Sequence, residues 1–373
     1  MSRMSRVALA AVVLSSVLAL AATTSAQQST FSTLTTTPLP IEGLTSDAAS
    51  LYTIGRAGAA SPCPVWQIDL GAPRLVVVGL VPNPCNPSGL AFNSSGQLFM
   101  VDADRIYTLT PSASAPPTAR VFASGVPGAN GIAFDPLGNA WTGDGTTGQG
   151  RVWKVTREGQ VTEVFRVPPI ASEANVAGGV GRDVRALPPG SVTITDTSRN
   201  SADTAGSQPL VANGLAFDRR GDLFIADTAR GAIWRVELDS RGDPTSPRGC
   251  DGAFAPNTLC LDNVFVAHPM LEGVDGIVVD EAGNLWCAAN ERNALVVVTP
   301  GKRVVEVFRN PREPVTGLRN AGPLEFPTSP VVAGRTVCTA NSDGNRRDNS
   351  PNTAGEVTPA GPGRGKISCA GRR

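Results

Sequence analysis

Short apolar runs recur along this chain in a fixed order, and that order differs from a helical period. A glycine opens a run, a polar turn closes on a second glycine seven residues later, and another apolar run follows. Four clear copies begin at Gly89, Gly131, Gly214 and Gly276. A looser copy runs from Gly43 through Leu51, and a degenerate copy precedes Gly334. The chain therefore carries six copies of one pattern.

Each copy predicts a meander of four short strands. In the copy that begins at Gly214, the first three strands are expected at Leu215–Phe217, Leu223–Ala226 and Ile233–Leu238. The third strand recurs at Arg105–Thr110, Arg151–Thr156 and Leu295–Thr299, and the fourth strand is expected at Arg74–Leu80, Arg120–Ala123, Val161–Val167, Asn263–His268 and Arg303–Phe308. Four strands per unit and a period of about 40 residues are typical of β-propeller blades.

These repeats predict an all-β fold, a six-bladed β-propeller of four-stranded antiparallel blades over residues 40–373, with residues 27–39 as an N-terminal linker. Long helical periodicity is absent, and a β-sandwich would leave the repeated four-strand unit unexplained. Two intervals exceed the period. The insertion Pro168–Leu210 is expected on the face where the first strands of the blades begin, and the insertion Asp239–Leu261 on the opposite face.

Residues 1–26 have the features of a cleavable signal peptide. Arg3 and Arg6 precede the almost wholly apolar stretch Val7–Ala22, and Thr24-Ser25-Ala26 supplies the small residues that signal peptidase requires. The apolar stretch is shorter than the roughly 20 residues that span a bilayer, so stable membrane insertion is not expected. The prediction is export, with cleavage, to a secreted or periplasmic location.

The charge of the chain excludes some classes of partner. The chain has 32 basic and 32 acidic residues, and loss of the two arginines of the signal peptide leaves 30 against 32, a net charge of −2. This balance favours neither nucleic acid nor an anionic membrane surface as a partner. A monomer that handles a small-molecule substrate is therefore expected.

Seven cysteines in an exported chain predict disulfide bridges and one remaining thiol. The expected pairs are Cys63–Cys85, Cys250–Cys260 and Cys338–Cys369. Cys250 and Cys260 share one loop, while the other two pairs would each tie a blade to itself or to its neighbour. Sequence alone does not prove connectivity. Cys287 stands within an apolar strand and is expected to be a buried, free thiol.

The residue before each repeat glycine carries the candidate chemistry. These residues are Glu42, Ser88, Asn130, Asn213 and Asp275, with Thr328 or Ser329 in the sixth copy. Because the inner strands of a propeller converge on its axis, equivalent positions should face one channel mouth. Two carboxylates and two amides at that mouth are hard oxygen ligands, which suit Ca²⁺, Mg²⁺ or a similar divalent ion.

Asn130-Gly131 and Asn213-Gly214 also allow a plainer interpretation, because Asn-Gly often marks a hairpin turn. In the copy at Gly214, however, residues Asp218–Gly221 already supply the hairpin turn, and the dipeptide stands at the entrance of the strand. Asparagines on an axis can also be structural and cap loops in a water-filled channel. The ligand and structural interpretations both stay open.

At these motifs the chain resembles the senescence-marker-protein/gluconolactonase family, whose members are six-bladed propellers with one divalent metal on the axis. The family's acidic-Gly, Asn-Gly and Asp-Gly motifs match Glu42-Gly43, Asn213-Gly214 and Asp275-Gly276, and an asparagine that meets substrate or metal-bound water matches Asn130. The resemblance implies metal ligands at Glu42, Asn213 and Asp275, with Asp275 also as general base. Ca²⁺ is the favoured ion, and Mg²⁺, Zn²⁺ and Mn²⁺ are alternatives.

The resulting hypothesis is a secreted, metal-dependent, lactonase-like hydrolase that acts on a lactone or a sugar-acid-like molecule. Asp275 would take a proton, and Asn130 would hold the substrate or the developing oxyanion. Arg56 and Arg230, on loops of the site face, could receive a carboxylate or a hydroxylated substrate, or could be solvated surface residues. His268, the only histidine, is either a proton shuttle or an ordinary strand-end residue.

Two other classes stay open at this point. A non-catalytic, NHL-like propeller could bind an ion or ligand in the same channel, and a strictosidine-synthase-like or paraoxonase-like enzyme could have the same architecture. The fold by itself does not separate these functions.

Overall fold

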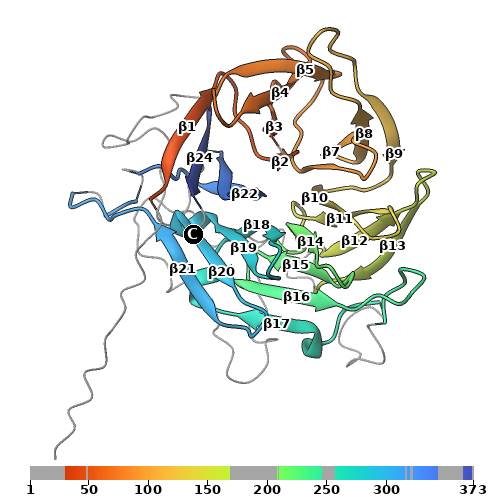
Figure 1. Ribbon diagram of the computed structural model, residues 1–373. Helices are drawn as coiled ribbons and strands as arrows, with labels where there is room; N and C mark the ends of the chain where they lie inside the picture. The colour runs from red at the N-terminus through yellow and green to blue at the C-terminus, as the bar shows by residue number, and fades with distance from the viewer. Residues whose placement is uncertain are drawn as a thin grey trace, which may run out of the picture.

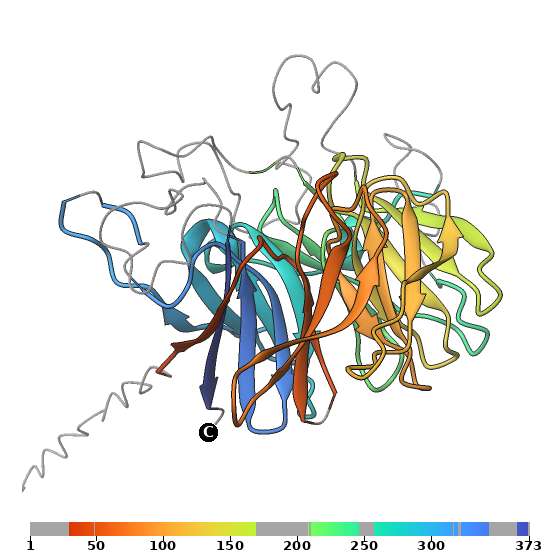
Figure 2. The same cartoon turned by 90° about the horizontal axis from the view of Figure 1, so that it is seen from above.

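The computed structural model describes residues 30–47, 49–168, 208, 210–245, 257–315, 317–319, 322–342 and 364–371. Within these residues, six four-stranded antiparallel sheets surround one central axis (Figure 1). The view turned by 90° shows the strands running between two loop-bearing faces (Figure 2). The predicted all-β, six-bladed propeller is confirmed.

Blades 1 to 5 follow the chain in order, and in each of them the first strand lies nearest the axis. Blade 1 contains β2 (Leu44–Ser46), β3 (Ser50–Ile54), β4 (Cys63–Asp69) and β5 (Leu75–Val81); blade 2 contains β6 (Leu90–Phe92), β7 (Leu98–Asp102), β8 (Arg105–Leu109) and β9 (Arg120–Ser124); blade 3 contains β10 (Ala129–Phe134), β11 (Ala140–Asp144), β12 (Arg151–Val155) and β13 (Val161–Arg166). Blade 4 contains β14 (Leu215–Phe217), β15 (Leu223–Asp227), β16 (Ala232–Val236) and β17 (Val264–Ala267); blade 5 contains β18 (Val274–Val279), β19 (Leu285–Ala289), β20 (Ala294–Val298) and β21 (Val304–Arg309). The helices among the described residues are the short 3-10 segments η3 (Leu261–Asn263), η4 (Pro269–Leu271) and η5 (Asn290–Arg292).

The sixth blade joins the two ends of the described chain. Its strands are β22 (Pro327–Ala333), β23 (Thr336–Asn341), β24 (Gly365–Gly371) and, as the outermost strand, β1 (Ser32–Thr37). β1 lies beside β24 in both views, and Ser32 pairs with Cys369 (Figures 1 and 2). Residues 27–39, expected to be a linker, therefore contain a strand of the propeller. Strand β1 therefore completes blade 6 and closes the ring, because the first and last described strands belong to one sheet.

The turn between the first two strands explains the polar part of the repeat. The side chains of Asn93, Asp135, Asp218 and Asp280 each accept a backbone N–H from the residue four positions later, at 2.8–3.0 Å. The closing glycines, Gly96, Gly138, Gly221 and Gly283, have φ angles of 76°, 83°, 88° and 81°. Such angles strain any residue with a Cβ, which accounts for the second glycine of each copy.

The hydrophobic core lies between adjacent blades. Trp141 of blade 3 and Trp234 of blade 4 are fully buried and share one cluster with Phe165 and Leu215. Corresponding clusters join the other pairs of neighbouring blades, for example Phe224 of blade 4 with Leu285 of blade 5. Burial of one such apolar side chain contributes about 1.5–3 kcal/mol, so the blades stabilise one another.

The structure contains the bridges Cys63–Cys85 and Cys338–Cys369, the second of which links β23 to β24. Cys260 is disulfide-bonded as well, and its expected partner, Cys250, lies outside the described residues. Cys287 is a free, buried thiol in β19, as expected, and its burial raises its pKa above the usual value.

Several expectations concern residues that the structure does not describe. These are the signal peptide 1–26 and almost all of the insertion 168–210, so the predicted face of that insertion is not tested. Of the insertion Asp239–Leu261, residues 246–256 lie outside the description as well. No helix within the described ranges is long and apolar enough to cross a membrane.

At the axis, the inner strands approach so closely that no side chain would fit at the first repeat glycine. A Cβ atom on Gly43 would lie 2.1 Å from the Ser88 carbonyl oxygen, and one on Gly89 would lie 2.3 Å from that of Asn130. The corresponding distances are 2.5 Å from Gly131 to Asn213, 2.4 Å from Gly214 to Asp275 and 2.4 Å from Gly276 to Thr328. The repeat opens on glycine because each inner strand presses against the backbone of the next one.

This packing predicts a large effect for Gly214→Ala. The new Cβ would lie 2.4 Å from the Asp275 carbonyl oxygen and 2.7 Å from the Gly276 Cα, both backbone atoms that cannot rotate away. We expect the free energy of unfolding, measured by urea denaturation, to fall by about 1–3 kcal/mol. Gly301→Ala is the matched control, because its nearest heavy atom is 3.9 Å away. Equal losses for both variants would contradict the close-packing explanation.

Candidate functional site

Six residues that precede the repeat glycines, or the equivalent serine, lie at one level around the axis. They are Glu42, Ser88, Asn130, Asn213, Asp275 and Thr328, and we call them the axial ring. Backbone bonds fix the level, since the N–H of Gly89 donates to the Asn130 carbonyl at 2.7 Å. Thr328 Oγ1 donates to the Glu42 carbonyl at 2.6 Å and so closes the ring between blades 6 and 1.

The two Asn-Gly pairs are not the hairpin turns of their blades. Asn130 lies within β10, and Asn213 lies two residues before β14. The turns of these blades lie at the other end of the inner strands, where Asp135 and Asp218 accept the closing hydrogen bonds. The Asn-Gly pairs therefore mark the close approach at the axis.

Directly beyond the axial ring, one residue from each blade surrounds the channel. The residue after each repeat glycine, or after Ser329, is one of Leu44, Leu90, Ile132, Leu215, Ile277 and Pro330, and these residues line a cavity of about 70 Å³. Gly89, Gly131, Gly276 and Ser329 line it as well, and polar atoms supply most of its surface.

The amide of Asn213 has a fixed orientation. Thr228 Oγ1 donates its proton to the Val274 carbonyl at 2.7 Å, so this hydroxyl can only accept from Asn213 Nδ2, 3.1 Å away. The other end of the amide, Asn213 Oδ1, is buried and accepts no hydrogen bond from any described residue. A buried, unpartnered carbonyl oxygen is costly, and a positively charged ligand would offset that cost.

Asp275 is a buried carboxylate that hydrogen-bonds to the same asparagine side chain. Asn290 Nδ2 donates to Asp275 Oδ2 at 2.9 Å, and Asn213 is a second hydrogen-bonding neighbour. Burial raises the pKa of Asp275 well above its usual value, and the negative charge of Glu42 raises it further, while the two asparagines oppose the shift. Two carboxylates held together out of water favour either a shared proton or a cation.

Glu42 is already paired on one side. Its Oε2 lies 2.6 Å from Arg56 Nη1, and the Nε of Arg56 donates to Asn86 Oδ1 at 2.7 Å. The structure thus brings Arg56 next to the axial ring, as expected for a site-face residue. Both of these guanidinium nitrogens, Nη1 and Nε, however, already bind side chains of the protein.

Asn130 lies beside Asn213. A Cβ atom on Gly145 would be 2.6 Å from Asn130 Cβ and 2.7 Å from Asn213 Oδ1, so one glycine separates the two amides. Asn130 is nearly buried, and its backbone carbonyl accepts from Ser88 Oγ at 3.1 Å. The side chains of Glu42, Asn130, Asn213 and Asp275 are therefore near neighbours, although they come from four different blades.

These residues fit a divalent ion of the hard, oxygen-binding kind. The donor set consists of two carboxylates and the unpartnered amide oxygen of Asn213, which are ligands that Ca²⁺ and Mg²⁺ prefer. Among the described residues, no three His, Cys, Asp or Glu side chains are arranged so that they could hold a metal ion, so an ion at the axial ring would need the amide oxygen of Asn213 as well as the two carboxylates.

Arg230 has other surroundings than the sequence indicates, whereas His268 lies at a strand end as one of its two interpretations expects. Arg230 is fully buried, and its Nη1 lies 2.9 Å from Asp227 Oδ2, so it does not present an open guanidinium to a ligand. His268 caps η4, where its Nδ1 accepts the N–H of Met270 at 3.1 Å. Burial lowers the pKa of His268, and the charge of Arg292 lowers it further. These contacts match the ordinary strand-end interpretation of His268.

A pocket of about 350 Å³ adjoins the axial ring at blades 1 to 3. Glu42, Ser88 and Asn130 of the ring line it, together with Arg56 and Asp102. It is large enough for a small organic ligand.

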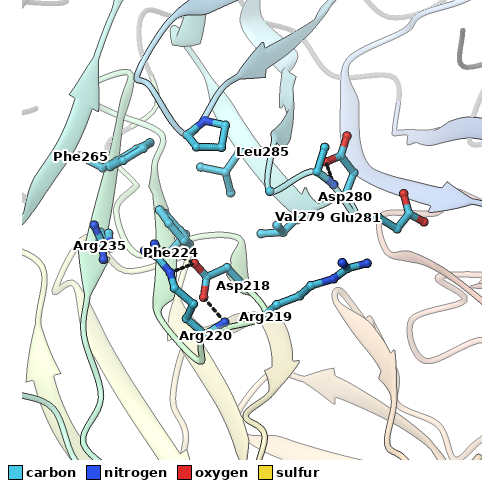
Figure 3. A pocket seen from close by; sticks show the side chains of 13 residues that line it. Asp218, Arg219, Arg220, Phe224, Arg235, Phe265, Val279, Asp280, Glu281 and Leu285 are labelled. Atoms are coloured by element: carbon cyan, nitrogen blue, oxygen red, sulfur yellow. Dashed lines mark hydrogen bonds and ion pairs between the residues drawn. The ribbon is translucent and has the colours of Figure 1, made fainter.

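A second pocket, of about 290 Å³, lies between blades 4 and 5 at the opposite end of the inner strands (Figure 3). Phe224, Phe265 and Leu285 form its apolar part. Its arginines are largely paired within the protein, since Arg220 lies 3.2 Å from Asp218. No residue of the axial ring lines this pocket, so it is separate from the candidate site.

The sequence interpretation missed Thr228, Asn290 and Asp102. A weak signal was present, because the second strand of blades 2, 3 and 4 ends on Asp102, Asp144 and Asp227, respectively. In blade 5 the residue that follows this strand is Asn290. Alignment of the repeats at the second strand, and not only at the first glycine, would have marked these positions as a second polar layer.

No curated protein sequence matches the chain, but residues 174–323 match the profile described as the SMP-30/Gluconolactonase/LRE-like region. Solved structures with the same fold include a luciferin-regenerating enzyme, with 13% identity and a TM-score of 0.57 over 92% of this chain and 95% of that chain. A regucalcin from Agrobacterium tumefaciens, described as a calcium-binding protein, has 17% identity and a TM-score of 0.56 over 92% and 96%. PQQ-bound aldose sugar dehydrogenase from Streptomyces coelicolor has 15% identity and a TM-score of 0.51 over 92% and 98%.

Identities this low show the fold and leave the chemistry open. The profile match includes Asn213 and Asp275, whereas Glu42 and Asn130 lie before it. The predicted family resemblance is thus supported by the profile over that range and by the propeller architecture over the rest. The chain is a six-bladed β-propeller whose residues 174–323 form an SMP-30/gluconolactonase/LRE-like region.

Proposed function

We propose that this chain is an exported, divalent-cation-dependent hydrolase that opens a lactone at the axial ring. The observation that carries the proposal is the buried Asn213 Oδ1, which has no described hydrogen-bond partner and belongs to a side chain that hydrogen-bonds to the buried carboxylate of Asp275. If these groups served only to stabilise the fold, Asn213 Oδ1 would be expected to accept a hydrogen bond and the Asp275 carboxylate to be paired with a positive charge. Their arrangement therefore favours a ligand-binding role.

Glu42, Asn213 and Asp275 are the residues that would hold the ion. Ca²⁺ fits the all-oxygen set best, Mg²⁺ is the next choice, and Mn²⁺ and Zn²⁺ remain alternatives. A bound divalent ion supplies Lewis-acid polarisation of the lactone carbonyl and lowers the pKa of a water molecule. The calcium-binding regucalcin of the same fold is consistent with this choice of ion.

The protein's own groups have separate tasks in ring opening. Asn290 holds Asp275 Oδ2 at 2.9 Å and so orients the carboxylate, which would take a proton from the attacking water. In the metal-free protein burial raises the pKa of Asp275, and a bound cation would favour its ionised form, which can accept a proton. Asn130, next to Asn213 across Gly145, would donate its amide N–H to the oxyanion that develops on the carbonyl.

Export is part of the proposal because two observations favour it. Residues 1–26 have the pattern of a signal peptide, and the bridges Cys63–Cys85 and Cys338–Cys369 are of the kind that persists in oxidising compartments. A monomeric state and a small-molecule substrate, without nucleic acid, remain predictions from the sequence.

A non-catalytic ion- or ligand-binding propeller is the second candidate. It is favoured by the axial hydroxyls, since Ser88 and Thr328 both donate to backbone carbonyls and neither is held as a nucleophile. In this case the ion would be bound without turnover. A strictosidine-synthase-like or paraoxonase-like activity remains a further alternative, because one fold can carry different chemistries. An aldose sugar dehydrogenase, for example, has the same fold.

The substitution Asp275→Asn tests the proposed function. It should abolish the stabilisation by Ca²⁺ and lower kcat for lactone hydrolysis by about 10²–10⁴-fold, because it removes both an ion ligand and the base. The metal-free variant should instead be more stable, with Tm higher by about 2–4 °C. The reason is that the substitution removes a buried charge from beside Glu42.

Asp262→Asn is the control for this experiment, because Asp262 is an exposed acid in η3. It should leave hydrolysis and the Ca²⁺ effect unchanged. Full activity of Asp275→Asn would contradict the role of Asp275 as base. Ca²⁺ binding by the wild type without hydrolysis of any lactone on a broad panel, with or without chelator, would favour the binding propeller.

The raised pKa of Asp275 predicts how stability depends on pH. In the unfolded chain this carboxyl titrates at about 3.9. Because its pKa is higher in the metal-free folded protein, the folded state binds the proton more tightly, and stability should fall as pH rises from about 4 through the raised pKa. The ion requires the carboxylate, so the rise in Tm on adding Ca²⁺ should grow over the same window.

Thermal unfolding with EDTA and with excess Ca²⁺, at a series of pH values, measures this effect. Asp275→Asn should remove the pH dependence of the difference in Tm. A Ca²⁺-induced shift that stays constant across the window would mean that the ion does not displace a proton from Asp275.

A further inference from the structure

The pocket beside the axial ring has a charge pattern of its own. Its polar residues at the ring side are Glu42, Arg56, Asn86, Ser88, Asp102 and Asn130, and we call it the Asp102 pocket. Its volume of about 350 Å³ is ample for a five- or six-membered ring with substituents. A ligand that reacts at the axial ring would place its neighbouring atoms there.

Arg56 is poorly placed to receive a carboxylate from such a ligand. Its Nη1 lies 2.6 Å from Glu42 Oε2, and its Nε donates to Asn86 Oδ1 at 2.7 Å. An incoming anion would have to compete with the negative charge of Glu42 for the same guanidinium. The expectation that Arg56 binds a carboxylate therefore has no support in these contacts.

Asp102 is the group in the pocket with accepting capacity left. It ends β7, is 7% exposed, and both of its oxygens share one donor, the backbone N–H of Asn86, at 3.1 and 3.2 Å. Among the described residues, the backbone N–H of Asn86 is the donor whose hydrogen bonds to the Asp102 carboxylate are seen. An ionised carboxylate offers about four lone-pair positions, so further donors can bind it.

The hydroxyl groups around Asp102 do not provide such donors to a ligand. Thr146 Oγ1 donates to the Gly128 carbonyl at 3.2 Å, Thr147 Oγ1 donates to Asp144, and Ser88 Oγ donates to the Asn130 carbonyl. Their protons point into the protein. The pocket thus presents mainly acceptors.

The net charge of the pocket is negative with or without an ion. Its charged lining residues are Glu42, Arg56, Asp102 and Asp104, which sum to +1 − 3 = −2. A divalent ion would add +2, and the adjacent Asp275 would add −1, which leaves −1. Asp104 contributes less than Asp102, because its side chain is 56% exposed and therefore well screened.

We propose that the Asp102 pocket binds a protonated amine carried by the ligand, and that Asp102 is the residue that determines this specificity. Compared with a neutral hydroxyl group, which has one donor, an ammonium group supplies three donors and a charge opposite to that of Asp102. A carboxylate at the same place would meet the negative charge of Asp102, which Arg56 and Arg105 offset only in part, since its pKa stays raised. That the ligand reacts at the axial ring rests on the proposed function. The preference for a positively charged ligand does not depend on it.

The test uses three five-membered rings that cannot be hydrolysed: 3-aminotetrahydrofuran, 3-hydroxytetrahydrofuran and tetrahydrofuran-3-carboxylate. Their dissociation constants are measured by NMR titration at pH 7, with Ca²⁺ and with EDTA. We expect the ammonium compound to bind tightest and the carboxylate weakest in both conditions, with at least about a tenfold difference between them.

The variant Asp102→Asn should reduce the ratio of ammonium to carboxylate affinity by about tenfold, since it keeps an acceptor for Asn86 but loses the charge. Asp104→Asn is the matched control and should change the ratio much less. An unchanged Tm shows that each variant is folded, and the order of affinities in the wild type tests the proposal even if Asp102→Asn unfolds.

Tightest binding of the carboxylate, no detectable binding of any of the three rings, or a ratio that Asp102→Asn leaves unchanged would each overturn the proposal. These results can be told apart from a failure of the proposed hydrolase function. A protein that prefers the ammonium ring but hydrolyses no lactone would retain the Asp102 pocket and lose the hydrolase.

Discussion

The close approach of six backbones at one axis is the constraint on which the rest of this structure depends. At five of the six positions a Cβ atom on the inner strand would lie between 2.1 and 2.5 Å from the carbonyl oxygen of the next strand, so glycine is required there. At the sixth position, Thr328 bonds to the Glu42 carbonyl and closes the ring. The same packing sets the height of the preceding residue in every blade. Side chains that are up to 286 residues apart in the sequence therefore meet at one level.

This arrangement costs stability at the place where it can bind a ligand. Asp275 and Glu42 are held close together out of water, and Asn213 Oδ1 is buried without a described partner. Neighbouring groups would orient the proposed ligands of the ion, since Thr228 fixes the amide of Asn213 and Asn290 holds the carboxylate of Asp275.

Much of this could be predicted from the sequence, because the repeat encodes two local requirements: a glycine for the axial contact and an Asx turn for the first hairpin. The six blades and the axial residues follow from those requirements. Strand β1 could not be predicted, because Ser32–Thr37 carries no repeat motif and is defined only by its pairing with β24. The partners of Arg56 and Arg230 were missed for a related reason. Whether an arginine faces a ligand or a carboxylate of its own chain depends on tertiary contacts, such as Glu42 with Arg56.

The central claim is that the axial ring gathers oxygen ligands from separate blades around one divalent ion. The most direct measurement is anomalous diffraction from crystals of the mature protein soaked with Ca²⁺, collected at a wavelength where calcium scatters anomalously. The account predicts a single strong peak on the axis, about 2.3–2.6 Å from Asn213 Oδ1 and from carboxylate oxygens of Glu42 and Asp275. The absence of a peak at the axial ring under saturating Ca²⁺, or a peak bound only by other residues, would contradict it.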